Sequence, residues 1–222
     1  WNQAPVYDWF EINILGTEIP KPINQNDFTE TVTLPFTFKY YGNEFTHLRI
    51  SSDGWIAFGS GTETAFENKS LPSVDGINNM IAVFWDDLFT DVVAPDAKLI
   101  YYNDIPNNRF IIEWYKVPHV TDIDERETFQ IILQDPAFYP TTTGDGEIIF
   151  QYHDVEEPSS VTVGIENSTE DIGLLYLHNE LYDATANEVQ NELAIKLTTK
   201  IPTITTIREE GNHGEEILPK SY

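Results

Sequence analysis

The stretch Arg109-Phe-Ile-Ile-Glu-Trp-Tyr115 decides the fold, because Phe110, Ile112 and Trp114 alternate in it with their neighbours. A period of two places such side chains on one side of a pleated strand. The same alternation recurs in later runs, at Glu127–Gln134, Ile148–Tyr152, Val161–Ile165 and Leu193–Leu197. Repeated strands of this kind are typical of antiparallel sheets that bury one face and leave the other wetter.

Turn-forming residues separate the runs. Asp53-Gly54 lies between two strand-like segments and predicts a hairpin with a type I′ turn, which needs positive φ at both central residues. Asn107-Asn108 and Gly144-Asp145-Gly146 mark two more turns, whereas helical periodicity is nearly absent, apart from a turn or two that Tyr182–Glu192 could hold. The pattern predicts an all-β, antiparallel, jelly-roll-like sandwich of about a dozen short strands with little helix.

The chain has 222 residues, which suits one large sandwich, and its 13% of aromatic residues argues against disorder. We expect residues 1–200 to form a single domain and residues 201–222 to form a tail. Ile201–Ile207 alternates Ile and Thr like an edge strand, and the rest is typical of a linker. The chain begins at Trp1 without a Met or a signal peptide, which we interpret as a removed leader or a fragment.

The charge is strongly acidic, with 12 basic against 37 acidic residues and a formal net charge of −25. Such a field repels phosphate groups, so we expect no nucleic-acid partner and no binding to anionic membranes. No apolar run approaches the ~20 residues that span a bilayer. The absence of cysteine excludes a disulfide scaffold, a thiol nucleophile and a Cys-ligated zinc site. Solubility outside the cell, a salty habitat or divalent-cation sites would each account for the acidity.

Acidic residues gather after Trp85, at Asp86, Asp87, Asp91 and Asp96. Calcium takes six to eight oxygen ligands, and loops rich in Asp supply them. These four residues are therefore the candidate metal ligands, with calcium as the possible cofactor. The spacing of an EF-hand loop is absent, and one of the carboxylates could instead cap a turn.

Catalytic motifs are missing from the sequence. It contains no G-x-S-x-G, no H-E-x-x-H and no glycine-rich phosphate loop, so we predict no enzymatic activity. The five histidines, at positions 47, 119, 153, 178 and 213, are scattered singly and are interpreted as ordinary surface or half-buried residues. Asp122–Glu127 could supply paired carboxylates to a sandwich glycosidase, but a solvated loop that leads into a strand fits its neighbours better.

Exposed aromatic side chains could form a platform for a surface glycan, although most aromatics of a sandwich belong to its core. Tyr115 is the candidate most expected to face outward, because it alternates with Trp114. The other candidates are Trp55, Trp85, Trp114, Tyr101 and Tyr102.

A family resemblance is carried by Tyr40-Tyr-Gly-Asn-Glu-Phe-Thr-His-Leu-Arg-Ile-Ser-Ser-Asp-Gly-Trp-Ile-Ala-Phe58. This stretch resembles the opening of the extracellular nidogen-type (NIDO) domain, with its aromatic-Gly lead and its Asn/Asp-Gly turn between two strands. Ile81-Ala-Val-Phe-Trp-Asp-Asp-Leu88 is similar to the family's "IAPFWADxD" element, and the later strands follow in the same order, so that the similarity covers roughly residues 36–166. The resemblance implies adhesion and extracellular assembly, and it supplies no catalytic residues.

The last residues, Glu216-Ile-Leu-Pro-Lys-Ser-Tyr222, resemble the segment before a type IX secretion sorting domain, which implies transport to the bacterial cell surface. We therefore expect a secreted, non-catalytic surface module that binds a glycan or a protein, adheres or assembles. The alternatives are an accessory domain of a larger secreted hydrolase and a homo-oligomer or filament subunit joined by strand exchange through residues 201–207. A sandwich glycosidase is the least favoured alternative.

Overall fold

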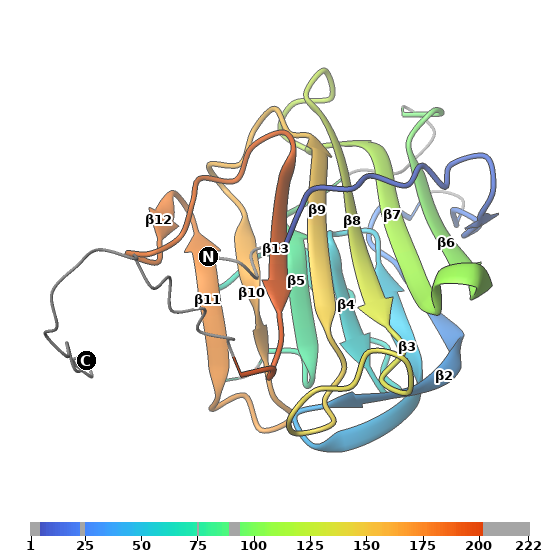
Figure 1. The fold of residues 1–222 in the computed structure, drawn as a ribbon. Coiled ribbons are helices and arrows are strands. Elements are labelled where there is room, and N and C mark those ends of the chain that lie inside the picture. Colours follow the sequence, from blue (N-terminus) through green and yellow to red (C-terminus); the bar gives the residue numbers. More distant parts are fainter. Residues whose placement is uncertain (1–4, 23–24, 75, 89–93, 202–222) are drawn as a thin grey trace, which may run out of the picture.

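The computed structural model describes residues 5–22, 25–74, 76–88 and 94–201, and the described residues form two packed antiparallel sheets (Figure 1). The six-stranded sheet has the order β1 (Thr17–Glu18), β6 (Lys98–Asp104), β7 (Arg109–Pro118), β8 (Arg126–Gln134), β9 (Ile148–Asp154), β13 (Leu193–Leu197). The seven-stranded sheet has the order β12 (Leu181–Tyr182), β11 (Gly173–His178), β10 (Thr162–Glu166), β5 (Met80–Trp85), β4 (Trp55–Phe58), β3 (Asn43–Ser51), β2 (Thr29–Tyr40). One 3₁₀ turn, η1 (Ile105–Asn107), joins β6 to β7. The all-β antiparallel prediction is confirmed.

The chain builds the sheets as two meanders. Strands β2 to β5 follow one another in the seven-stranded sheet, and β6 to β9 follow one another in the six-stranded sheet. β10 then returns to pair with β5, and β13 crosses back to pair with β9. The likeness to a jelly roll therefore lies in the two packed antiparallel sheets, while the order within each sheet comes from consecutive hairpins.

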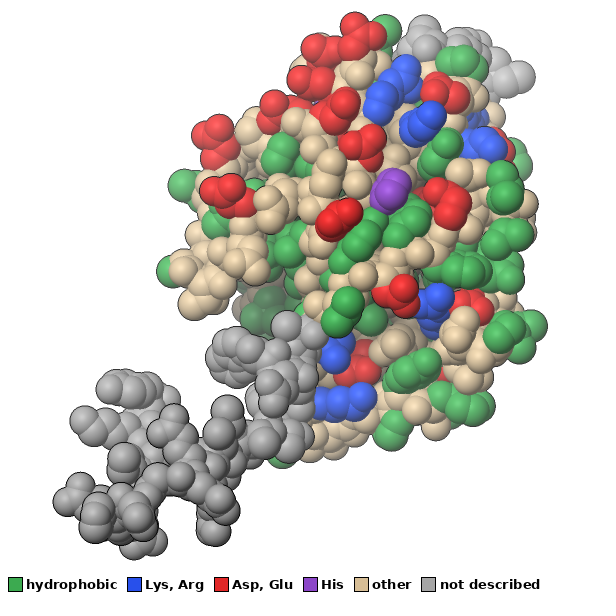
Figure 2. Space-filling model, turned by 45° about the horizontal axis from the view of Figure 1, so that its top comes forward, with side chains coloured by type: hydrophobic (Ala, Val, Ile, Leu, Met, Phe, Trp, Pro, Cys, Tyr) green, Lys and Arg blue, Asp and Glu red, His purple; other side chains and the backbone are tan. Residues whose placement is uncertain are grey.

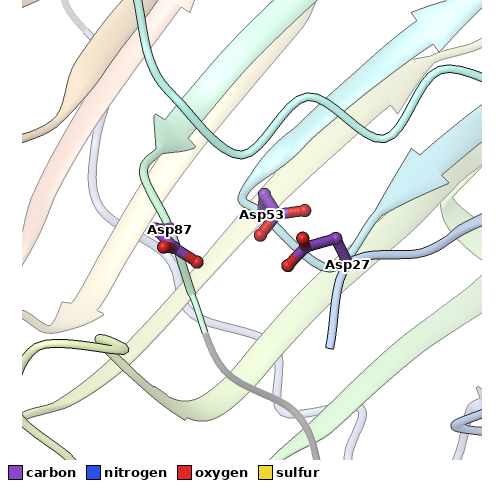
Figure 3. Close-up of side chains that lie close together, drawn as sticks. All are labelled: Asp27, Asp53 and Asp87. Carbon is purple, nitrogen blue, oxygen red and sulfur yellow. The ribbon is translucent and has the colours of Figure 1, made fainter. Parts of the chain in front are cut away.

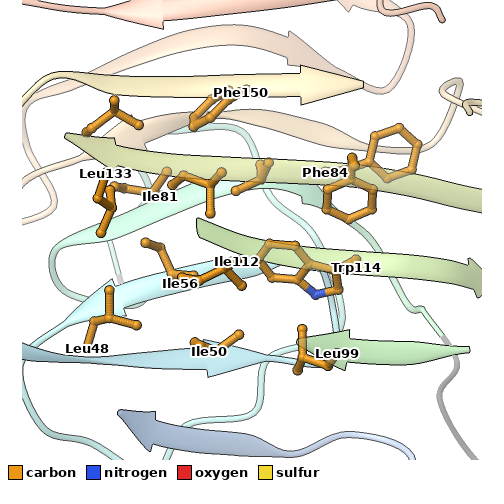
Figure 4. Close-up of a cluster of buried hydrophobic side chains, with 14 of the residues drawn as sticks. Leu48, Ile50, Ile56, Ile81, Phe84, Leu99, Ile112, Trp114, Leu133 and Phe150 are labelled. Atoms are coloured by element: carbon orange, nitrogen blue, oxygen red, sulfur yellow. The ribbon is translucent and has the colours of Figure 1, made fainter. Parts of the chain in front are cut away.

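The core lies between the sheets, and the predicted alternation places its residues there (Figure 4). Trp114 is fully buried, stacks on Phe129 with ring centroids 5.0 Å apart, and donates its indole N–H to Ser51 O at 2.9 Å. The Tyr152 hydroxyl donates to Val83 O at 2.8 Å, from one sheet to the other. The two sheets are thus joined by hydrogen bonds as well as by apolar packing.

The outer faces of the central strands are drier than the sequence predicts. On the six-stranded sheet, Ile111 and Ile132 are buried beneath Phe10 and Ile12 of the N-terminal segment, which crosses that sheet in Figure 1. On the seven-stranded sheet, Trp55, Trp85 and three smaller strand residues form a second outer cluster with Leu71 and Ile77 of the loop that joins β4 to β5. The expectation of one wet face is wrong for these strands, because segments distant in sequence cover them.

The Asp53-Gly54 hairpin is present, but its turn differs from the prediction. The loop comprises residues 52–54, and only Gly54 has positive φ, at 74°. Gly54 O accepts hydrogen bonds from Val83 N and Phe84 N, both at 3.0 Å, and a Cβ at position 54 would lie 1.9 Å from Phe84 O. This close packing against β5 demands glycine and decides the shape of the turn.

The region after β12 contains turns in place of the helical turn that Tyr182–Glu192 could hold. The predicted edge strand at 201–207 and the sorting-domain lead-in at 216–222 lie outside the described residues, apart from Ile201. Within the part of the chain that the structure describes, no helical stretch could cross a lipid bilayer.

Candidate metal centre

Three aspartates meet at one end of the seven-stranded sheet (Figure 3). Asp27 precedes β2, Asp53 lies in the β3–β4 turn, and Asp87 follows β5. One carboxylate oxygen of each lies within 4.8 Å of the other two. The fold therefore brings together the Asp-Gly turn and the Trp-Asp-Asp element, which are the two motifs of the family resemblance.

The aspartates are held by hydrogen bonds within this end. Ser52 N donates to Phe28 O at 3.0 Å, and Phe28 N donates to Ser52 Oγ at 3.1 Å, which fixes the Asp27 loop against the turn. Asp53 Oδ2 accepts from the hydroxyls of Ser51 at 3.1 Å and Ser52 at 3.0 Å. These bonds use one carboxylate oxygen of Asp53 and leave the other free.

The electrostatics of the cluster are unfavourable for three ionised carboxylates. Burial and the neighbouring Asp27 raise the pKa of the fully buried Asp53 to about 8. Burial and Asp27 also raise the pKa of Asp87 to about 6, and burial raises the pKa of Asp27. Asp53 Oδ1 and Asp27 Oδ1 are buried without a hydrogen-bond partner. Among the described residues no salt bridge joins any of the three carboxylates to Lys or Arg, and the charge of His119 only partly offsets the raised pKa of Asp87.

Of the four candidate calcium ligands, only Asp87 belongs to this cluster. Asp86 turns the other way, and Asp96 lies 3.3 Å from Arg126 Nη1 with its side chain 56% exposed. Asp91 lies outside the described residues. Sequence reasoning missed Asp27 and Asp53, because Asp53-Gly54 was interpreted only as a hairpin turn and Asp27 carried no signal of its own.

A second ionic centre lies beside the first. His119 is 2% exposed, and its Nδ1 lies 3.0 Å from Asp86 Oδ2 while its Nε2 lies 3.2 Å from Glu127 Oε1. Burial alone would lower the pKa of His119, but its hydrogen bonds to Asp86 and Glu127 outweigh burial and raise the pKa to about 9. The imidazolium therefore joins the end of β5 to β8 across the two sheets. The interpretation of this histidine as a surface or half-buried residue is wrong, because the ring is buried between Asp86 and Glu127.

The carboxylate run at 122–127 is a loop that leads into β8, as its neighbours in the sequence indicate. Asp122 and Asp124 are exposed, whereas Glu127 is fully buried and accepts backbone N–H bonds from Glu156 and Glu157. Figure 2 shows acidic side chains gathered over the upper part of that view. The loop supplies surface charge, and its one inward carboxylate is engaged by His119.

Most of the aromatic platform candidates are in the core or half-buried. The three tryptophans, at positions 55, 85 and 114, are all buried, and Trp55 and Trp85 both donate to Ala65 O, at 2.9 and 3.0 Å. Tyr115 lies on the outer face of the six-stranded sheet, half-buried against the cluster that Ile12 covers, with Lys116 Nζ 5.4 Å from its ring centroid. The prediction of an outward orientation fits this position, although the N-terminal segment shields part of the ring.

These features define a two-sheet β-sandwich domain with an oxygen-donor centre and a carboxylate–histidine centre side by side at one end. A family model described as NIDO related matches residues 8–208, and the chain therefore belongs to the NIDO-related family. The match begins before and ends after the stretch of 36–166 that carries the resemblance. Neither the search of curated proteins nor the search of solved structures found a match.

Proposed function

We propose that this protein is a non-catalytic extracellular module that binds or assembles at the cell surface. The observation that carries the proposal is the NIDO-related match over residues 8–208, because domains of this type are typically extracellular. The net charge of −25 supports it, since a strongly acidic surface keeps a secreted protein dispersed. The carboxylate–histidine centre also fits a structural role, because His119 and Glu127 are buried.

Two measurements test this proposal. In the source cells, an antibody against the domain should detect it on intact cells, and external protease should remove the signal; protection until lysis would contradict an extracellular role. Purified protein should release no product from polysaccharide and protein substrates. Turnover that is lost in Asp124→Asn or Glu125→Gln would establish the glycosidase alternative instead.

Assembly between copies is the second candidate, and an edge of the sandwich favours it. β13 pairs only with β9 among the described strands, and its residues are all partly exposed. Beside it lies an apolar cavity of about 320 Å³ between the two sheets, lined among others by Tyr41, Ile148, Leu174 and Leu197. An unpaired edge strand accepts an added strand through its main-chain groups. We propose that residues 201–207 of a neighbouring copy supply that strand.

Deletion of residues 201–222 tests the assembly candidate. Light scattering of the full chain should show species that grow with concentration, and the shortened chain should remain monomeric with an unchanged circular-dichroism spectrum. A full chain that stays monomeric at every concentration, or a deletion variant that assembles like the parent, would rule out exchange of this strand. The accessory-domain alternative is separate, and a catalytic domain encoded in the same gene would favour it.

A further inference from the structure

We propose that Asp27, Asp53 and Asp87 form a calcium site that ties the Asp27 loop, the β3–β4 turn and the end of β5 together. This inference goes beyond the proposed function and rests on the spacing of the three carboxylates and on their unpartnered buried oxygens. Its three ligands come from three separate connections, so one bound ion would cross-link them (Figure 3). The site differs from the acidic loop that the sequence suggests, because two of its three ligands lie elsewhere.

The spacing suits calcium. Three atoms within 4.8 Å of one another have a common point no more than about 2.8 Å from each, against calcium–oxygen distances of about 2.3–2.6 Å. Movements of a few tenths of an ångström would therefore complete the contacts. Magnesium binds at about 2.0–2.1 Å and demands a regular octahedron, so it would require a larger contraction of a turn that packs against β5.

The buried unpaired oxygens point to a ligand. Asp53 is fully buried, and its Oδ1 has no hydrogen-bond partner although its Oδ2 has two. Asp27 Oδ1 is in the same state, as is the amide oxygen of the adjacent Asn26. A buried acceptor without a donor costs about 1–3 kcal/mol, and a cation in the cluster would offset that cost for the aspartate oxygens that it contacts. Each of these atoms is an oxygen, which is the ligand type of calcium and magnesium rather than of zinc or copper.

Protons are the competing explanation, because carboxyl groups this close can share them in place of a metal. Glu113 provides the internal comparison. It is another fully buried carboxyl group, and burial raises its pKa to about 8 as well, yet it accepts hydrogen bonds from Gln130 Nε2 at 2.6 Å and Ile12 N at 3.3 Å. Glu113 also keeps one oxygen, Oε1, without a hydrogen-bond partner and has Glu11 nearby. The feature that distinguishes Asp53 is that one oxygen of each of two further carboxylates lies within 4.8 Å of its own. Removal of each carboxylate therefore separates a cation site from a protonated acid.

The test uses the full chain stripped of metal with EDTA, then transferred to chelator-free buffer with about 0.15 M NaCl to screen weak surface binding. Calcium chloride is titrated by isothermal calorimetry, and unfolding temperatures are compared in calcium and in EDTA. The parent should bind one calcium ion per chain and unfold at a higher temperature in calcium, because a ligand of the native state stabilises it. Asp53→Asn and Asp87→Asn should each lose roughly tenfold or more in affinity and most of the temperature shift.

Two matched controls keep the result specific. Glu113→Gln removes a buried carboxylate outside the cluster, and Asp96→Asn removes an exposed one from the acidic region after Trp85. Both variants should keep the calcium response of the parent. If Asp53→Asn does not fold, the half-buried Asp87→Asn and the titration of the parent decide the matter. A parent with no saturable calcium site, an equal or greater affinity for magnesium, or an unchanged affinity in both cluster variants would each overturn the proposal.

Discussion

Glu113 offers a quantitative test of how this sandwich tolerates a buried acid. It lies in β7 under the N-terminal segment, is fully buried, and has one oxygen, Oε1, without a hydrogen-bond partner. Burial raises its pKa from 4.5 to about 8, and the nearby Glu11 adds to the shift. Glu113→Gln replaces the protonated acid by a neutral group of nearly the same shape. The variant should therefore be more stable than the parent at neutral pH.

The size of the effect follows from proton linkage. Below pH ~4.5 the Glu113 carboxyl group is protonated in both the folded and the unfolded state, so its pKa shift does not change the free energy of unfolding. As the pH rises, this group ionises in the unfolded chain but keeps its proton in the folded chain. The parent therefore loses stability with rising pH until the pH passes the folded pKa of about 8. One pKa unit corresponds to about 1.36 kcal/mol, so the loss between pH ~5 and ~8 is about 3 kcal/mol. The amide introduced by Glu113→Gln does not titrate, and the variant escapes this loss.

Urea unfolding, followed by tryptophan fluorescence at several pH values across this window, measures the difference. The free energy of unfolding of Glu113→Gln minus that of the parent should grow by about 3 kcal/mol from pH ~5 to pH ~8. The exposed Glu30→Gln serves as the control and should follow the parent throughout. If the curves of variant and parent run parallel, Glu113 is ionised in the folded state and the reasoning from its burial is refuted.

Three further predictions concern contacts within and between the two sheets. His119→Gln should lower the free energy of unfolding by about 3 kcal/mol near pH 6, as measured by urea unfolding. The difference should disappear as the pH rises through 9, because a histidine with a raised pKa stabilises the folded state only while its ring is protonated. Gly54→Ala should cost more than about 3 kcal/mol, visible as a large fall in unfolding temperature, since its new Cβ would meet Phe84 O. Tyr152→Phe should lower the free energy of unfolding, measured with urea, by about 1 kcal/mol, because it removes the hydrogen bond to Val83 O.

The inner faces of the strands were predictable because their signal is local. In β7, Phe110, Ile112 and Trp114 repeat every second residue, and a pleated strand turns that repeat into one apolar face whatever the rest of the chain does. The burial of the outer faces could not be predicted, because nothing in the sequence of β7 indicates that Phe10 and Ile12 cover its outer face. A strand covered on both faces differs from a half-buried one only through residues far away in the sequence.

The same distinction explains the candidate site. Asp87 could be found from local acidic density, whereas Asp53 looked like an ordinary turn residue and Asp27 like an ordinary loop residue. Each of these contacts joins residues tens of positions apart, and only the pairing of β2 with β3 and of β4 with β5 brings them together. His119 was misread because Asp86 lies 33 residues away and because nothing in the sequence shows that Glu127, eight residues away, points inward.

The neighbouring residues Asp86 and Asp87 link the two centres. Asp86 reaches His119 and Ser160, at 3.0 and 2.5 Å, while Asp87 reaches the aspartate cluster and its carbonyl accepts from Val120 N at 3.0 Å. Consecutive residues of an extended chain point to opposite sides, so one dipeptide after β5 can serve both centres. The imidazolium is hydrogen-bonded to Asp86 and Glu127, and its charge lowers the pKa of Asp87 less than burial and the neighbouring carboxylates raise it. A cation there would complete an end of the sandwich in which both acidic centres have a positive partner, and the three connections would then be fixed relative to both sheets.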